Sequence, residues 1–217
     1  MATMYETIME LPLFKGIGED QLSILLEKTS IEFVKYEKGD VIYQADEKVK
    51  FINFILNGKV RQSFKLDNFA LTVEEILGRG AMIGATHLFG METYYTGKSV
   101  AIENVSLMKI AKNQYMDILQ SDKIYLLNYV NYLSAEAQTI PSLITSGNGS
   151  SIRRMLEILI YSIVSRAAEE VMIYGDDNEL ARYCGVNNSK FEEWKAEEIA
   201  KKEIVSEEGF IRLKKPF

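Results

Sequence analysis

Between residues 31 and 111, short runs rich in β-branched and aromatic residues alternate with glycines, and this alternation constrains the fold more than any other feature. The strand-like runs are IEFVKY, DVIYQ, FINFIL, KVRQSFKL, LTVEEIL and VSLMKI. The glycines between them are Gly39, Gly58, Gly78, Gly80, Gly84, Gly90 and Gly97. Many short strands at regular spacing, with glycine at tight turns, predict a sandwich, a barrel or a β-roll.

Helical periodicity flanks this β region. An amphipathic helix is expected over 19–29, and QYMDILQS predicts another short helix. A longer stripe follows, with apolar residues spaced four and three apart as in a heptad seam. Its members are Leu126, Val130, Leu133, Ala137, Ile140 and Ile144. The stripe fits either a core helix packed on the β region or a dimer seam; its polar flanks favour the dimer, and Pro141 is expected to kink or end the helix.

The small-residue stretch TSGNGSS at 145–151 predicts the boundary between two domains. After it, Ser151 is expected to cap a helix that runs to about residue 170. At the end of the chain, EIVS and FIRLK flank a glycine-containing turn and predict a hairpin.

Residues 178–199, NELARYCGVNNSKFEEWKAEEI, predict a helix, a tight turn and a second helix. Ala181 and Gly185 supply the small residue and the turn glycine of a helix-turn-helix. Ser189 and Glu192 have the spacing of a capping box, so the second helix is expected to start near Lys190. Its inward face would carry Phe191, Trp194 and Ile199.

Many proteins place the second helix of a helix-turn-helix in the major groove of DNA. The second helix here is acidic, which is unusual for a surface that meets phosphates. The chain has a net charge of −6, and residues 150–217 hold 11 Lys and Arg against 13 Asp and Glu. We expect an acidic outer face, made of Glu192, Glu193, Glu197 and Glu198. Candidate DNA contacts are Asn187, Asn188, Ser189, Lys190 and Glu193, since a glutamate can accept a hydrogen bond from cytosine. Candidate backbone contacts are Lys195, Lys201, Lys202, Arg212, Lys214 and Lys215.

Several chemistries are excluded by the residue inventory. With His87 and Cys184 as the single histidine and cysteine, we expect no metal, no disulfide and no His-dependent triad. TGKS lacks the upstream glycine of a P-loop. No nucleophile–base pair identifies an enzyme. Neither a signal peptide nor a long apolar run is apparent, so the expected location is the cytoplasm.

The order of these elements resembles the superfamily of the cyclic-AMP receptor protein and the fumarate–nitrate regulator (CRP/FNR). The resemblance rests on PLFKGIGEDQL, VKYEKGDVIYQ, FINFILNGKVR, GRGAMIGA, SVAIENVSLMKI and NELARYCGVNNSKF. It implies an α+β chain with a cyclic-nucleotide-binding-type, jelly-roll-like β-roll and a winged helix-turn-helix. The expected domains are 1–145, with a dimerisation helix at about 122–144, and 146–217.

The effector position departs from the pattern of this superfamily. Its cyclic-nucleotide binders place a glutamate after the roll glycine, whereas Ala85 follows Gly84 here. Their arginine for the cyclic phosphate, and the Ser or Thr after it, fall on Tyr95 and Thr96 or, with a longer loop, on Lys98 and Ser99. We therefore expect a small effector other than cyclic AMP, or none. The cysteine cluster of iron–sulfur sensors is also missing.

The resemblance implies a homodimeric transcription regulator whose partners are DNA, a second copy of the chain and RNA polymerase, with no membrane. The arginines common on such recognition helices are missing at Asn188 and Glu193. An alternative function is therefore a ligand-sensing or protein-interaction module with a degenerate winged helix.

Overall fold

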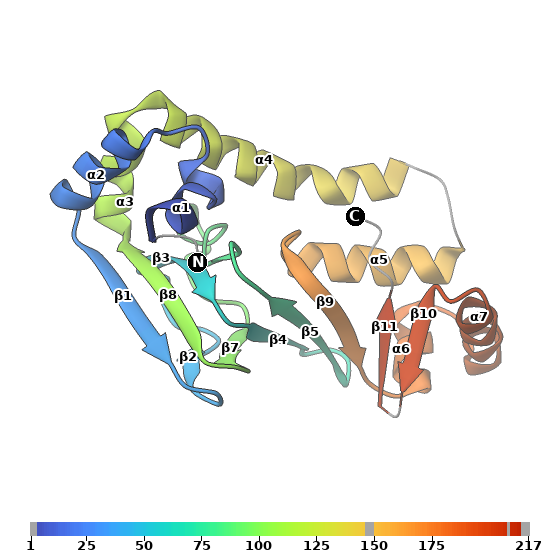
Figure 1. The fold of residues 1–217 in the computed structure, drawn as a ribbon. Helices are drawn as coiled ribbons and strands as arrows, with labels where there is room; N and C mark the ends of the chain where they lie inside the picture. Colours follow the sequence, from blue (N-terminus) through green and yellow to red (C-terminus); the bar gives the residue numbers. More distant parts are fainter. Residues whose placement is uncertain (1–3, 146–149, 208, 214–217) are drawn as a thin grey trace. The chain divides into compact units, whose positions relative to one another are not determined.

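The computed structural model describes residues 4–145, 150–207 and 209–213 (Figure 1). Contacts divide the chain into two compact units, one of residues 1–61 and 77–136 and the other of residues 62–76 and 137–217. The expected hinge at TSGNGSS falls largely on 146–149, outside the described residues. Each unit is described by itself.

The first unit holds most of the β region and the helices around it. Its helical elements are α1 (Met4–Met9), η1 (Pro12–Phe14), α2 (Glu19–Lys28), α3 (Lys112–Ser121) and the start of α4 (Lys123–Thr145). Its strands are β1 (Ile31–Tyr36), β2 (Val41–Tyr43), β3 (Phe51–Asn57), β6 (Met82–Ile83), β7 (Lys98–Ala101) and β8 (Val105–Ala111). Most were predicted from sequence; α1, η1, β6 and β7 were not.

Four of these strands form an antiparallel sheet in the order β1-β8-β3-β6, and β2 pairs with β7 (Figure 1). The register places Ile31 opposite Ile110 and Ile52 opposite the same residue from the other side. Ile52 and Ile110 are fully buried. The turn at Gly58 requires glycine: its φ is 82°, and a Cβ there would lie 2.3 Å from the carbonyl oxygen of Asn104.

Helix α4 has two faces of different character. Tyr125 and Tyr129 are buried, and the Tyr125 ring packs on Phe14 with centroids 6.1 Å apart. On the other side, Leu126 and Val130 of the heptad stripe are 46% and 47% exposed. At Leu126 and Val130 the interpretation of the stripe as a core face is therefore wrong, because Tyr125 and Tyr129 fill that role. Of the two outcomes expected at Pro141, a kink or an end of the helix, the helix does not end at the proline but continues to Thr145.

The second unit combines a hairpin from the middle of the chain with its C-terminal part. Its strands are β4 (Val60–Leu66), β5 (Leu71–Leu77), β9 (Ala168–Tyr174), β10 (Ile204–Glu207) and β11 (Phe210–Leu213). Its helices are the end of α4, α5 (Ser151–Ile163), α6 (Asp177–Tyr183) and α7 (Asn188–Ala200). Neighbouring strands follow the order β10-β11-β9-β5-β4.

Strand β9 corrects the helix predicted to reach about residue 170. Helix α5 ends at Ile163, and Val164 already has the extended ψ of 152°. The segment AEEVMIY forms a strand because β11 and β5 lie on either side of it and satisfy its backbone groups. The cap of α5 also lies one residue earlier than expected, since Ser150 accepts a hydrogen bond from the Arg153 amide at 3.2 Å.

The α6–α7 pair has the expected turn but a different cap. Gly185 has a φ of 67° between the two helices, a conformation that glycine adopts freely. Asn187 caps α7 by accepting from the Lys190 amide at 2.9 Å. The predicted Ser189–Glu192 capping box is wrong, because α7 begins at Asn188 and Glu192 instead accepts from the Asn188 side chain at 2.8 Å.

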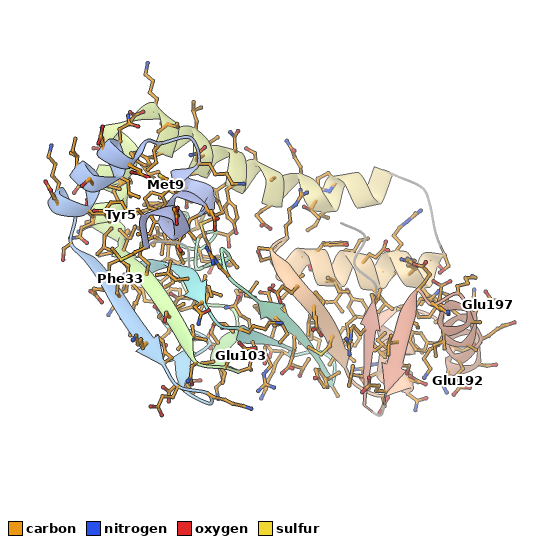
Figure 2. The ribbon with its side chains drawn as sticks, viewed as in Figure 1. Tyr5, Met9, Phe33, Glu103, Glu192 and Glu197 are labelled. Atoms are coloured by element: carbon orange, nitrogen blue, oxygen red, sulfur yellow. The ribbon has the colours of Figure 1, made fainter. Side chains whose placement is uncertain are left out.

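The acidic face of α7 is smaller than predicted. Glu192, Glu193 and Glu197 are exposed, and Figure 2 shows Glu192 and Glu197 at the surface of α7. Glu198 is buried, which corrects its expected place on the outer face. It accepts from Arg153 at 3.0 Å, and Arg153 also bonds Glu157 and Glu203. Ile199, predicted to point inward, is 42% exposed.

The buried Glu198 pair predicts unequal effects of two neighbouring substitutions. Glu198→Gln should lower the free energy of unfolding by about 1–3 kcal/mol, because it removes one partner of a largely buried ion pair. Glu197→Gln, on a side chain that is 62% exposed, should change it by less than about 0.5 kcal/mol. Urea denaturation of the full chain measures both values, and equal losses would contradict this role for Glu198.

Candidate functional site

The loop at Gly84 and Ala85 lies against the interior of the first unit. Gly84 has a φ of 83°, and a Cβ there would lie 3.1 Å from Val49 and 3.2 Å from the Tyr95 ring. Ala85 is 2% exposed, and its carbonyl accepts from the Tyr129 hydroxyl at 2.7 Å. Ala85, where the resemblance places the glutamate of cyclic-nucleotide binders, is therefore a small, buried residue whose carbonyl is hydrogen-bonded to helix α4.

The Tyr95 side chain is buried in a closed polar cluster. Its ring stacks on Tyr43 with centroids 4.2 Å apart. Both hydroxyls converge on the side chain of Asn53, which accepts from Tyr43 at 2.7 Å and donates to Tyr95 at 3.3 Å. Asn53 also donates to the Ile83 carbonyl at 3.2 Å. Burial raises the pKa of Tyr95 to about 12, so the phenol is neutral at physiological pH.

The remaining predicted effector residues lie outside this cluster. Thr96 and Lys98 are exposed, whereas Ser99 is fully buried on β7 opposite Tyr43. The structure thus brings together Gly84, Ala85 and Tyr95 but not Thr96 or Lys98. Sequence reasoning missed Tyr43, Asn53 and Tyr129. A signal for Asn53 existed, since it is a polar residue inside the apolar run FINFIL.

Chemically, this interior is neutral and occupied by side chains. A nearby positive charge is that of Lys109, whose ammonium lies 4.6 Å from the Phe51 ring centroid and 5.5 Å from that of Tyr43. A ribose would ordinarily be held by a carboxylate that accepts from its hydroxyls. Among Gly84, Ala85, Tyr43, Tyr95 and Asn53, no side chain is ionised at neutral pH.

The predicted DNA-contacting residues gather at the first turns of α7. Asn187, Ser189, Lys190 and Glu193 are exposed, and Asn188 is half-buried. The amide oxygen of Asn187 is engaged as the helix cap, which reduces its capacity to accept from a base edge. Among the predicted backbone contacts, Lys195 pairs with Asp177 and Lys201 with Glu198. Lys214 and Lys215 lie outside the described residues.

The heptad stripe is the third predicted site. Ala137 is exposed like Leu126 and Val130, and Leu133 and Ile140 are half-buried. The side chain of Ile144 lies outside the described residues. Leu127, beside the stripe, is 58% exposed. Helix α4 therefore presents apolar side chains to solvent over several turns in the single chain.

Metal chemistry has no counterpart in the described ranges, where no group of three or more His, Cys, Asp and Glu residues could hold an ion. Burial raises the pKa of Cys184 to about 12, which keeps its thiol protonated. Burial also lowers the pKa of His87, and its Nδ1 lies 2.9 Å from the Thr86 hydroxyl. Over the same ranges, no helix has the length and apolar character needed to cross a membrane.

Comparisons with known proteins bear on both units. Residues 33–122 match the family model of the cyclic nucleotide-binding domain. Comparison with curated protein sequences found no match. Among solved structures, the catabolite activator protein of Thermus thermophilus is similar in fold, with a TM-score of 0.52, 15% identity and coverage of 94% of this chain and 93% of that one.

Two other solved structures are similar over the N-terminal part. One is the sensor domain of the transcriptional regulator DNR from Pseudomonas aeruginosa, with a TM-score of 0.53 and 17% identity, covering 67% of this chain and 94% of that one. The other is the N-terminal domain of a transcriptional regulator from Streptomyces coelicolor, with a TM-score of 0.50 and 17% identity, covering 66% and 99%. Residues 33–122 thus match the model of a cyclic nucleotide-binding domain, in a chain whose fold is similar to that of the Thermus catabolite activator protein.

Proposed function

We propose that this chain is a homodimeric, DNA-binding transcription regulator of the CRP/FNR type. The observation that carries the proposal is the α6–turn–α7 arrangement followed by the β10–β11 hairpin, with the start of α7 exposed. This arrangement is consistent with a winged helix-turn-helix, in which the second helix enters the major groove. The fold similarity to the Thermus activator over 94% of the chain supports the same assignment. RNA polymerase is an expected further partner.

The proposed mechanism is a shift between two populations of the dimer. The exposed stripe of α4 would pack against its copy, and an effector or partner that favours one packing would change the spacing of the two α7 helices. In a two-fold dimer these helices should meet half-sites about 34–36 Å apart. The effector would not be cyclic AMP, since Ala85 and the buried Tyr95 stand where the ribose and phosphate contacts are expected.

The exposed glutamates of α7 support a second candidate function. Glu192, Glu193 and Glu197 face solvent, and two of the nearby lysines are already paired with carboxylates. An acidic helix face fits a basic protein segment. Salt distinguishes the two functions, because DNA binding releases counterions and weakens steeply as salt rises.

Fluorescence anisotropy of the full chain with genomic fragments at low salt tests DNA binding. At least one fragment should bind about tenfold or more tighter than random duplex of equal length. Glu193→Arg should strengthen binding severalfold and steepen the dependence of log K on log salt by about one unit, because it places a cation beside the phosphates.

Glu103→Arg is the matched control, since Glu103 is exposed between β7 and β8 and undergoes the same change of charge (Figure 2). If no fragment exceeds random duplex, or if both arginine variants behave alike, DNA reading through α7 is refuted and the protein-partner function gains support.

The exposed stripe of α4 predicts a dimer, and two glutamates introduced into the stripe should dissociate it. In size-exclusion chromatography with light scattering, the wild-type protein should have a molar mass twice the 24.7 kDa of the single chain. Leu126→Glu combined with Val130→Glu should give the monomer, because like charges would be buried across the seam. Ile24→Glu, on an α2 side chain that is 51% exposed, should leave the dimer intact. At a protein concentration of about 100 µM, even a dimer with a dissociation constant in the micromolar range would form. A wild type that is monomeric at this concentration would contradict the seam.

The neutral interior predicts weak binding of cyclic nucleotides. Calorimetric titration of the wild-type dimer with cyclic AMP or cyclic GMP should give no saturation below about 1 mM, a binding free energy weaker than about −4 kcal/mol. The physical reason is that Ala85 offers no carboxylate to the ribose hydroxyls. Saturable binding in the micromolar range would overturn this part of the proposal.

A further inference from the structure

The tip of the β4–β5 hairpin contacts one face of helix α6. The amide of Ala70 donates to Glu179 Oε2 at 3.2 Å. Arg182 donates through Nη2 to the carbonyl of Asn68 at 3.0 Å and to Glu179 at 2.7 Å. Glu179 and Arg182 thus form a bracket that holds the backbone of the hairpin tip by one acceptor and one donor.

Aromatic contacts reinforce this bracket. The Arg182 guanidinium lies over the Phe69 ring, 4.8 Å from its centroid. The same ring meets Tyr183 edge-on, with centroids 5.2 Å apart. Residues 179, 182 and 183 share one side of an α-helix, so the tip rests on a continuous strip of α6. Each contact is modest, but together they involve hydrogen bonding, a cation over a ring and apolar burial.

A second set of contacts fixes the body of the hairpin to the same unit. Strand β5 is the neighbour of β9 in the sheet. Glu75, 1% exposed, accepts from the Ser165 amide at 2.9 Å, just before β9 begins. At the far end of β9, a Cβ on Gly175 would lie 2.2 Å from a methyl of Leu71. The hairpin therefore has anchors at both ends of β9 as well as on α6.

Helix α6 needs such support. It spans Asp177–Tyr183, too short to be stable by its own hydrogen bonds. Its inner side packs through the buried Leu180 and Ala181. Its outer side contacts the hairpin tip, which is far away in sequence.

We propose that the β4–β5 hairpin is a clasp on α6, and that the hairpin tip and α6 open and close as one cooperative unit. A displacement of β4 and β5 then reaches the α6–α7 pair directly, without passing through the long helix α4. This coupling is a property of the second unit, whether the partner of α7 is DNA or a protein.

Hydrogen exchange of the full wild-type chain, followed by mass spectrometry, tests the clasp. Phe69→Ala removes both ring contacts from the hairpin side, and it should speed exchange of peptides from 177–183 by about tenfold or more. Arg182→Ala removes the bracket from the helix side, and it should speed exchange at 67–71 to a similar degree. Lys65→Ala, an exposed change on β4, is the control and should alter neither segment.

Global unfolding is separated from clasp opening by exchange at 152–160 in α5, which should keep its wild-type protection in all three variants. Should Phe69→Ala unfold the unit, Phe69→Leu serves in its place, because leucine keeps an apolar side chain but offers no ring to the Arg182 guanidinium. The expected result is reciprocal acceleration of the two segments. Acceleration confined to the mutated segment would overturn the proposal, and a failure of DNA binding would leave it standing.

Discussion

The pairing of β5 with β9 is the contact on which the organisation of this chain depends. It makes a hairpin from the segment that matches the cyclic nucleotide-binding domain part of the unit that carries α6 and α7. The backbone groups of β9 are satisfied on both sides only because β5 and β11 flank it. The buried Glu75 then fixes where β9 starts, through its bond to Ser165. Strands that lie about 90 residues apart in the chain thus share one sheet.

Local signals predicted much of the fold. The alternation in IEFVKY and LTVEEIL placed β1 and β5, and the spacing of Leu126 and Val130 marked the exposed side of α4. The error at β9 has a physical cause. AEEVMIY continues an apolar helix without a break signal, and the partners that make it a strand lie elsewhere in the chain. Strand pairing between segments that are distant in the chain cannot be predicted from the residues of a short segment alone.

The candidate sites were predictable to different degrees. Gly84 and Ala85 followed from a glycine motif, yet the partners of Tyr95 did not, since Tyr43 and Asn53 reach it only after the strands have folded. On α7, the inward faces of Phe191 and Trp194 followed from periodicity. The burial of Glu198 could not be predicted from periodicity, because its ion-pair partner Arg153 lies on another helix. Charge counted along a sequence therefore overstated the acidity of the outer face.

The strands of this sheet emerge from the ribosome at different times during synthesis. Strand β5 leaves the exit tunnel well before β9, so the nascent chain carries a hairpin whose outer edge has no partner while α3, α4 and α5 are made. An unpaired edge is a template for association with other chains. Chaperone contact or slow elongation over the segment that precedes β9 would then govern the yield of folded protein. For this chain, β5 can gain its second neighbour only after residues 168–174 have emerged.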